Sequence, residues 1–247
     1  DYKYWETIGF KWADPYRGDR CAEVLSSGRK FTLQDFTTLQ TDYLSIPARN
    51  LVPLLRNLVS ADTSAEWARR MLLQWDFQLD KNAVAATLYD AWERQLRSQF
   101  EQMLLPTNVR TLVNIQTYRL VEFLLLPDGK FGTDPTRGRN DFVLQALSTA
   151  MQNLTTRFQG TPRSQWVYGQ EKYKHVLLRH PLSSAVNPEL RKKLDHGPLP
   201  RGGNAQTVGA TAAGYNQTHG ATFRLVVDTG NWDHCLATNS PGQSGNP

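Results

Sequence analysis

The chain has 247 residues, a formal net charge of +5 and an apolar content of 40%, which is typical of a globular protein rather than a disordered one. No run of about 18 apolar residues occurs, so the sequence contains no candidate membrane-spanning helix. Its basic residues form no dense stripe interleaved with aromatic side chains, which argues against a nucleic-acid-binding surface. The run Arg191-Lys192-Lys193 is therefore interpreted as a solvated face.

Residues 1–160 make up the mainly helical part of the predicted fold. They open with an irregular aromatic segment, after which a helix is predicted to begin near Pro15 and to end before Gly28. The run Thr32-Leu33-Gln34-Asp35 resembles a capping box, because a carboxylate follows the threonine after three residues. Apolar residues at helical spacing then extend this second helix to Pro47.

Further amphipathic stripes predict five more helices in the same part of the chain. Pro106 ends the longest of them, and a loop rich in glycine and proline is expected over residues 127–139. Since their apolar residues recur at helical spacing, these faces are interpreted as core. The predicted helices cover Leu51 to Leu58, Ser64 as a cap to Trp75, Ala83 to Leu104, Thr107 as a cap to Leu124, and Asp141 to Phe158.

The composition changes after residue 160. Glycine, proline, asparagine and threonine become more frequent, and helical periodicity is lost except in a short piece from Pro188 to Leu194. Residues 161–247 are therefore predicted to be rich in loops and strands, and to complete a sheet in one structural unit with residues 1–160. The predicted fold class is α+β, with a helical layer followed by antiparallel strands.

The last part of the chain carries the clearest strand signal. Phe223, Leu225 and Val227 point to one side of an extended chain, which is the period-two pattern of a half-buried strand. Thr229-Gly230-Asn231 supplies a turn, and His234 to Thr238 returns as a second strand. Because a lone hairpin is marginally stable in water, we expect it to join a larger sheet or to pack under the upstream helices.

Residue types that carry catalysis elsewhere form no self-contained site in this sequence. Ser244 lies in Gly-Gln-Ser-Gly, which lacks the spacing of a nucleophile elbow, and no glycine-rich phosphate loop occurs. The histidines show no close ligand pair for a metal. They are His175, His180, His196, His219 and His234. From these residues alone, the chain is interpreted as a helical domain with a β-rich tail, which leaves a non-catalytic interaction module as one hypothesis.

The two cysteines, Cys21 and Cys235, form neither a CxxC pattern nor a metal-ligand spacing. They could pair across the fold in an oxidising compartment. They could equally remain two separate half-buried thiols. The sequence leaves both alternatives open.

Several motifs together resemble the penicillin acylase family, whose members are N-terminal-nucleophile amidohydrolases. The resemblance spans nearly the whole chain, and the motifs occur in the order of the family. It rests on Gly9 to Arg20, Leu33 to Leu55, Leu73-Gln74-Trp75-Asp76, Gln165 to Gly169, His180-Pro181-Leu182, Pro200-Arg201-Gly202-Gly203, Ala221 to Asp228, and Asn239 to Gly245. In the family, these segments belong to the C-terminal part of the β chain.

The resemblance implies an αββα sandwich and a catalytic role for one residue of this chain. Asp19-Arg20-Cys21-Ala22-Glu23 is similar to a helix start that places an arginine beside the active site of the family. Arg20 is therefore expected to orient the asparagine that stabilises the oxyanion and to favour the developing negative charge. The alternative is that Arg20 and Glu23 form an ordinary ion pair on a helix surface.

The resemblance also implies that much of the active site lies outside this chain. Residue 1 is Asp1, whereas the nucleophile of the family is a serine at the N-terminus of its β chain. We therefore expect an internal fragment of a larger enzyme that lacks the nucleophile. No cofactor is expected in this fragment, and the calcium-binding carboxylates of the family lie mainly upstream.

The function implied by the resemblance is hydrolysis of the amide bond of small N-acyl compounds, such as the side chains of β-lactam antibiotics. An acyl-homoserine lactone acylase is the alternative within the same chemistry. The expected partners are the N-acyl substrate and the remaining α- and β-chain segments of the parent enzyme. The expected location is periplasmic or secreted.

Overall fold

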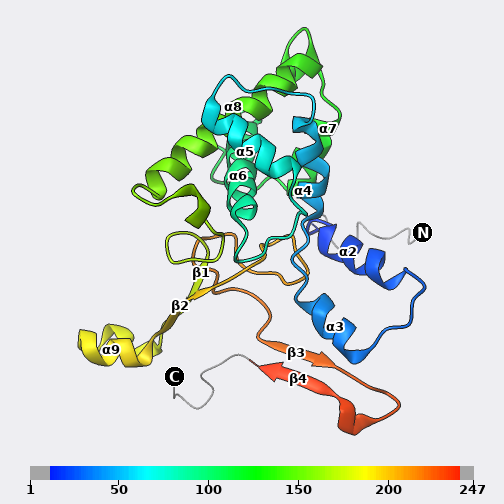
Figure 1. Cartoon of the computed structure of the whole chain (residues 1–247), viewed down its shortest axis with the longest axis vertical. Coiled ribbons are helices and arrows are strands. Elements are labelled where there is room, and N and C mark those ends of the chain that lie inside the picture. The colour runs from blue at the N-terminus through cyan, green and yellow to red at the C-terminus, as the bar shows by residue number, and fades with distance from the viewer. Residues whose placement is uncertain (1–11, 240–247) are drawn as a thin grey trace.

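Amphipathic helices build most of the computed structural model, which describes residues 12–239. Figure 1 shows helices α4 to α8 gathered at one end of the long axis, with α2 below them on one side and α3 lower still, while the strands occupy the middle and the other end. The helices are α2 (Tyr16–Leu25), α3 (Leu33–Gln40), α4 (Ile46–Leu51), α5 (Thr63–Leu73), α6 (Val84–Leu104), α7 (Thr117–Leu125), α8 (Pro135–Arg157) and α9 (Pro188–Leu194). Short 3-10 turns cover Val52–Leu55, Gly129–Phe131, Arg163–Gln165, Pro181–Ser184 and Trp232–His234.

The hydrophobic core lies where α6 crosses α5 and α8. Trp92 and Tyr89 of α6 are completely buried, as are Leu72 of α5 and Leu147 of α8. The indole N–H of Trp92 donates to the carbonyl oxygen of Val143 at 3.0 Å, so a large aromatic ring is buried without losing its hydrogen bond. The apolar stripe predicted for α6 is thus confirmed as core up to Phe100, whereas Met103 at its end is 37% exposed.

The capping box that begins the second predicted helix and the glycine that follows the first are both confirmed. The hydroxyl of Thr32 accepts from the backbone N–H of Asp35 at 3.2 Å, and the Asp35 carboxylate accepts from the backbone N–H of Thr32 at 2.8 Å. This reciprocal pair is a capping box, and it begins α3. Gly28 follows α2 with φ of +74°, a backbone conformation that glycine adopts without steric cost.

The prediction that the second helix continues to Pro47 is wrong. Helix α3 ends at Gln40, and the chain then runs extended through Tyr43 until Ser45 caps α4. Leu44 instead forms an isolated antiparallel bridge with Gln78. The apolar residues after α3 therefore serve tertiary contacts, although their spacing imitates a helix.

Four other predicted helix boundaries are corrected. Asp62, not Ser64, caps α5 by accepting from two backbone N–H groups. The segment after Thr107 forms turns, and its helix begins only at Thr117. Helix α8 begins at Pro135 instead of Asp141, because Asp134 caps it and proline suits the first helical position. The helix carrying Leu51 ends as a 3-10 turn at Leu55, before Leu58.

The strands form two antiparallel pairs within the described part of the chain. Strand β1 (His175–Leu178) pairs with β2 (His196–Pro200), and β3 (Phe223–Val226) pairs with β4 (Leu236–Asn239). The C-terminal hairpin and the short helix α9 are therefore confirmed. A mixed α+β composition is also confirmed, with each sheet limited to two strands among residues 12–239.

The hairpin of β3 and β4 buries the opposite side from the one that its sequence suggests. Val226 is only 7% exposed, whereas Phe223 and Leu225 are 56% and 47% exposed. Figure 1 shows β3 running below α3, and the side-chain amide of Gln40 donates to the carbonyl oxygen of Leu225 at 3.0 Å. The hairpin thus packs beside a helix, as one of the two expectations had it, but leaves an apolar side uncovered.

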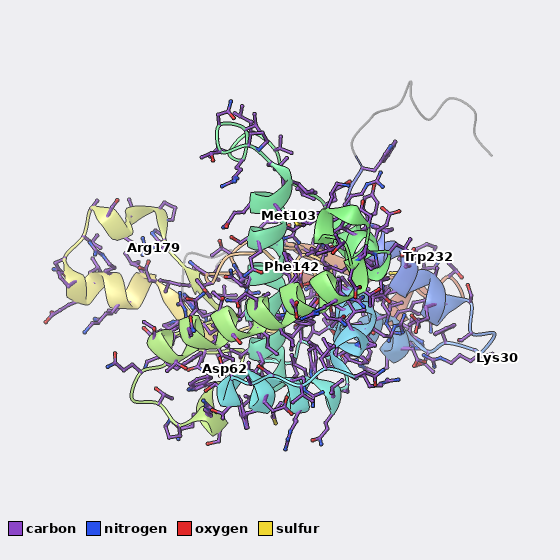
Figure 2. All side chains as sticks on the ribbon, turned by 90° about the horizontal axis from the view of Figure 1, so that it is seen from above. Lys30, Asp62, Met103, Phe142, Arg179 and Trp232 are labelled. Carbon is purple, nitrogen blue, oxygen red and sulfur yellow. The ribbon has the colours of Figure 1, made fainter. Side chains whose placement is uncertain are left out.

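Strands β1 and β2 and helix α9 form an arm that projects from the helical body. This arm leaves the body at the opposite side from the loop of Lys30, as the position of Arg179 in Figure 2 shows. All five residues of β2 are exposed. None of the helices described between residues 12 and 239 combines the length and apolar character that crossing a bilayer requires.

Candidate functional site

Arg20 lies on α2 and points at the segment that follows α3. Its Nε and Nη2 atoms both donate to Oδ2 of Asp42, at 3.0 and 2.7 Å, and its Nη1 atom donates to Oε1 of Glu23 at 3.0 Å. The side chains of Arg20 and Asp42 are only 17% and 13% exposed. The ion pair with Glu23, which was the alternative interpretation of Arg20, is therefore present, but the more deeply buried partner of Arg20 is Asp42.

Glu23 connects Arg20 to a second arginine. Its two carboxylate oxygens accept from Nη1 and Nη2 of Arg49 at 3.0 and 2.8 Å, which is a bidentate pair. The hydrogen bonds from Arg49 hold the pKa of Glu23 below its ordinary value, so Glu23 is ionised at neutral pH. We call Asp42, Arg20, Glu23 and Arg49 the Arg20 cluster; its two positive and two negative charges alternate in space.

The backbone beside Asp42 is held from two directions. The carbonyl oxygen of Asp42 accepts from the N–H of Gly209, and that of Tyr43 accepts from the N–H of Leu79, both at 2.9 Å. The N–H of Ser45 donates to the carbonyl oxygen of Phe77 at 2.9 Å. This short extended segment therefore takes its hydrogen bonds from loops that are distant in sequence.

The Gly202-Gly203 motif fits against the aromatic ring of Tyr43. A Cβ atom added at Gly202, Gly203 or Gly209 would lie 2.7, 2.8 or 2.6 Å from that ring. The guanidinium of Arg201 lies 5.2 Å from the ring centroid and donates to the Tyr43 hydroxyl. Only glycine lets the backbone come this close to the ring. Gly202 and Gly203 therefore pack directly against Tyr43, the residue that follows Asp42.

A second polar cluster, absent from the predictions, lies on the buried face of α6. The ammonium of Lys174 is fully buried, lies 3.4 Å from Oδ1 of Asp90, and donates to the carbonyl oxygens of Ala213 and Gly214 at 3.0 and 3.1 Å. The other oxygen of Asp90 accepts from the Tyr173 hydroxyl at 2.7 Å. These contacts fasten the loop before Tyr215 to α6.

Burial shifts the pKa values of Asp90 and Lys174 in opposite directions. Burial raises the pKa of Asp90, but the nearby charges of Lys174 and Arg94 outweigh it and hold that pKa below its ordinary value. Burial also lowers the pKa of Lys174. One sequence signal was available, since Asp90–Arg94 and Glu93–Arg97 have the i,i+4 spacing of helix ion pairs.

A hollow of about 810 Å³ opens beside this cluster and is lined by α6, by residues 12–14 with Arg17, by residues 114–117, and by residues 204–206 with Ala213. Asp14 is one of its lining residues and caps α7 although it is distant in sequence, because its carboxylate accepts from the N–H groups of Thr117 and Tyr118 at 3.1 and 2.9 Å. Burial raises the pKa of Glu93 in its wall. Arg20 does not line this hollow.

The other candidate residues form no second site in the described part of the chain. Cys21 and Cys235 are separate, half-buried free thiols. No group of three or more metal-binding side chains gathers between residues 12 and 239. Ser244 lies outside the described residues.

Comparison with known proteins decides the family. The family model described as penicillin amidase matches residues 1–247. This chain belongs to the penicillin amidase family. The family predicted from the sequence motifs is therefore confirmed. Arg20 and its two hydrogen-bonded carboxylates, Asp42 and Glu23, all lie within the matched residues.

Penicillin amidase relatives are similar along almost the entire chain. The penicillin acylase 2 proenzyme of Pseudomonas sp. (strain SE83) is 30% identical over 94% of this chain and 30% of its own length. The acyl-homoserine lactone acylase QuiP of Pseudomonas aeruginosa is 25% identical over 99% of this chain and 33% of its own. QuiP of Pseudomonas fluorescens is 22% identical, over 99% and 32%. The chain thus spans about a third of the length of these relatives.

Proposed function

We propose that this chain is part of an acylase that hydrolyses the amide bond of N-acyl compounds through an N-terminal serine lying outside it. The observation that carries this proposal is the penicillin amidase match over every residue of the chain. The relatives support it because each is named an acylase and each is about three times longer than the part aligned here. This part alone, without the nucleophile, is expected to be inactive.

The proposed reaction is acyl transfer in two steps. The serine oxygen attacks the acyl carbon, and its proton passes to the α-amine of the same serine. The C–N bond then breaks as the leaving nitrogen takes that proton, which leaves an acyl ester that water hydrolyses. Arg20 would act on the oxyanion step, because its permanent charge can orient the asparagine donor and favour negative charge on the carbonyl oxygen.

A β-lactam with an acylated amine is the substrate class that we propose first. The support is the 30% identity to a protein named penicillin acylase, against 25% and 22% for the two named acyl-homoserine lactone acylases. The second candidate is hydrolysis of an acyl-homoserine lactone. It is favoured by the fact that both QuiP proteins match over 99% of the chain.

The remaining α- and β-chain segments of the parent enzyme are the proposed partners of this chain. The exposed side chains of Phe223 and Leu225 support this, because an apolar hairpin face of this kind is usually covered. Strands from those segments would extend the hairpin sheet toward the αββα sandwich. Calcium binding by upstream carboxylates and a periplasmic or secreted location belong to the same proposal.

The test is an activity assay on the complete protein purified from its full reading frame. It is incubated with a β-lactam carrying a phenylacetyl side chain and, separately, with an acyl-homoserine lactone, and mass spectrometry follows the free acid and the free amine. We expect release from the β-lactam, and none after the N-terminal serine is replaced by alanine. A folded protein that cleaves neither compound would refute the proposal and favour a non-catalytic helical interaction module.

A further inference from the structure

We propose that Asp42 is a positioning residue, which fixes the orientation of the Arg20 guanidinium in the acylase. This inference rests on the proposed function. The geometry that points to it is the pair of hydrogen bonds from Nε and Nη2 of Arg20 to Oδ2 of Asp42, at 3.0 and 2.7 Å.

The hydrogen bonds of Arg20 with Asp42 and Glu23 fix the plane of its guanidinium and determine which of its N–H donors stay unused. A guanidinium is planar and carries five N–H donors. Asp42 takes two of them and Glu23 takes one. One N–H on Nη1 and one on Nη2 therefore remain without a partner among the described residues. The two carboxylates fix the plane of the guanidinium, and with it the directions in which these two N–H groups can point.

Asp42 is suited to this task because backbone N–H groups hold both its carboxylate and its carbonyl oxygen. Its second oxygen, Oδ1, accepts from the backbone N–H of Leu44 at 2.7 Å. Its backbone oxygen accepts from the N–H of Gly209, and the adjacent Tyr43 ring is wedged against Gly202. Three contacts besides those to Arg20 thus hold this residue, and rotation of the carboxylate would break the hydrogen bonds at Oδ1 and Oδ2.

Glu23 constrains Arg20 less than Asp42 does. The Glu23 side chain is 40% exposed, against 13% for Asp42, so water competes more for its hydrogen bonds. Glu23 is also shared with Arg49, to which it is bound through both oxygens. Loss of Asp42 should therefore disturb the arginine more than loss of Glu23.

A double-mutant cycle in the complete acylase tests the inference. The variants are Asp42→Asn, Arg20→Ala and the two together, each assayed for kcat and KM on the substrate that the wild type cleaves. We expect Asp42→Asn to lower kcat by about tenfold or more with little change in KM, because a misaligned group loses transition-state contacts. In the Arg20→Ala background the same change should have no further effect.

The matched control is Asp128→Asn. Asp128 also accepts from a backbone N–H, at 3.0 Å, and also pairs with a cation, Lys130, at 2.8 Å, but it lies outside the Arg20 cluster. It should keep wild-type kcat. Should Asp42→Asn fail to fold, Asp42→Glu, which keeps the charge but lengthens the side chain, takes its place in the cycle.

Three kinetic outcomes overturn the inference. Asp42→Asn could keep the wild-type kcat, the two losses could multiply in the double variant, or Arg20→Ala could be fully active. A second readout does not depend on catalysis: the Arg20 Nε–H signal in nitrogen-15 NMR should be protected from exchange in the wild type and lose protection in Asp42→Asn. An unchanged signal overturns the inference even in a protein that lacks acylase activity, whereas an inactive wild type with the expected signals refutes only the proposed function.

Discussion

Glu93 places its carboxyl group where the side chain is only 10% exposed and the closest cation, Nη2 of Arg97, is 3.5 Å away. Burial raises its pKa above the ordinary value of 4.5. A carboxyl with a raised folded pKa contributes stability below its unfolded pKa, and that contribution is lost as the pH rises through the folded pKa. Ionisation of Glu93 therefore weakens the fold above about pH 4.5.

Glu93→Gln should remove this dependence. The amide keeps the shape of the side chain and cannot ionise, so the stability of the variant relative to the wild type should increase as the pH rises from 4.5. Urea unfolding at several pH values between about 4 and 8 measures it. Glu122→Gln, at a side chain that is 53% exposed, is the control and should follow the wild type. Parallel pH curves for Glu93→Gln and the wild type would contradict the account.

Among single residues, Arg20 was predicted from the sequence as a site residue. Asp42, the more deeply buried carboxylate that binds it, was not predicted as its partner. The motif with Glu23 lies within one helix turn and is visible as local spacing. Asp42 is 22 residues away, and only the path of the chain after α3 brings it back. Similarly, the i,i+4 spacing marks Asp90 and Arg94 as an ion pair, whereas the burial of Lys174 against Asp90 depends on a contact that no local pattern predicts.

Among the elements, the Gly202-Gly203 turn depends on a close approach to the Tyr43 ring. Gly202→Ala would place a Cβ atom 2.7 Å from the Tyr43 ring and 2.8 Å from the carbonyl oxygen of Leu79. The Leu79 carbonyl belongs to the backbone and can shift only by disturbing its neighbours. We therefore expect a loss of about 2 kcal/mol in the free energy of unfolding, measured by urea denaturation.

The control for this substitution is Gly18→Ala. Gly18 lies in α2, and no atom comes within 4 Å of an added Cβ. It should therefore stabilise the protein by roughly 0.5 kcal/mol, because alanine loses less conformational freedom in a helix. A Gly202→Ala protein as stable as the wild type would show that the close approach to Tyr43 does not constrain the turn.

Helices with strong local signals were predictable, and helices bounded by tertiary contacts were not. The capping box at Thr32 and the long stripe of α6 are encoded within a few residues. Tyr43 and Leu44 continue a helical spacing, but their backbone bonds to distant loops outweigh it and the chain runs extended. The alternation around Val226 predicted a strand correctly, whereas the side that it buries depends on α3 lying beside it.

Across the whole molecule, the helical body has a core of its own, while the C-terminal hairpin leaves apolar side chains exposed. This contrast agrees with a chain that spans about a third of the length of its relatives. The family could be recognised from the sequence because its motifs recur in order along the chain. The substrate could not, because no segment of this chain was assigned to the acyl pocket.

The most direct test of the account is the chain composition of the complete protein. Its full reading frame is expressed, and intact mass spectrometry is combined with N-terminal sequencing of each chain. The account predicts two chains, the larger beginning with serine and containing residues 1–247 internally, as expected of a self-processed N-terminal-nucleophile hydrolase. A single unprocessed chain that lacks an upstream serine segment would contradict it.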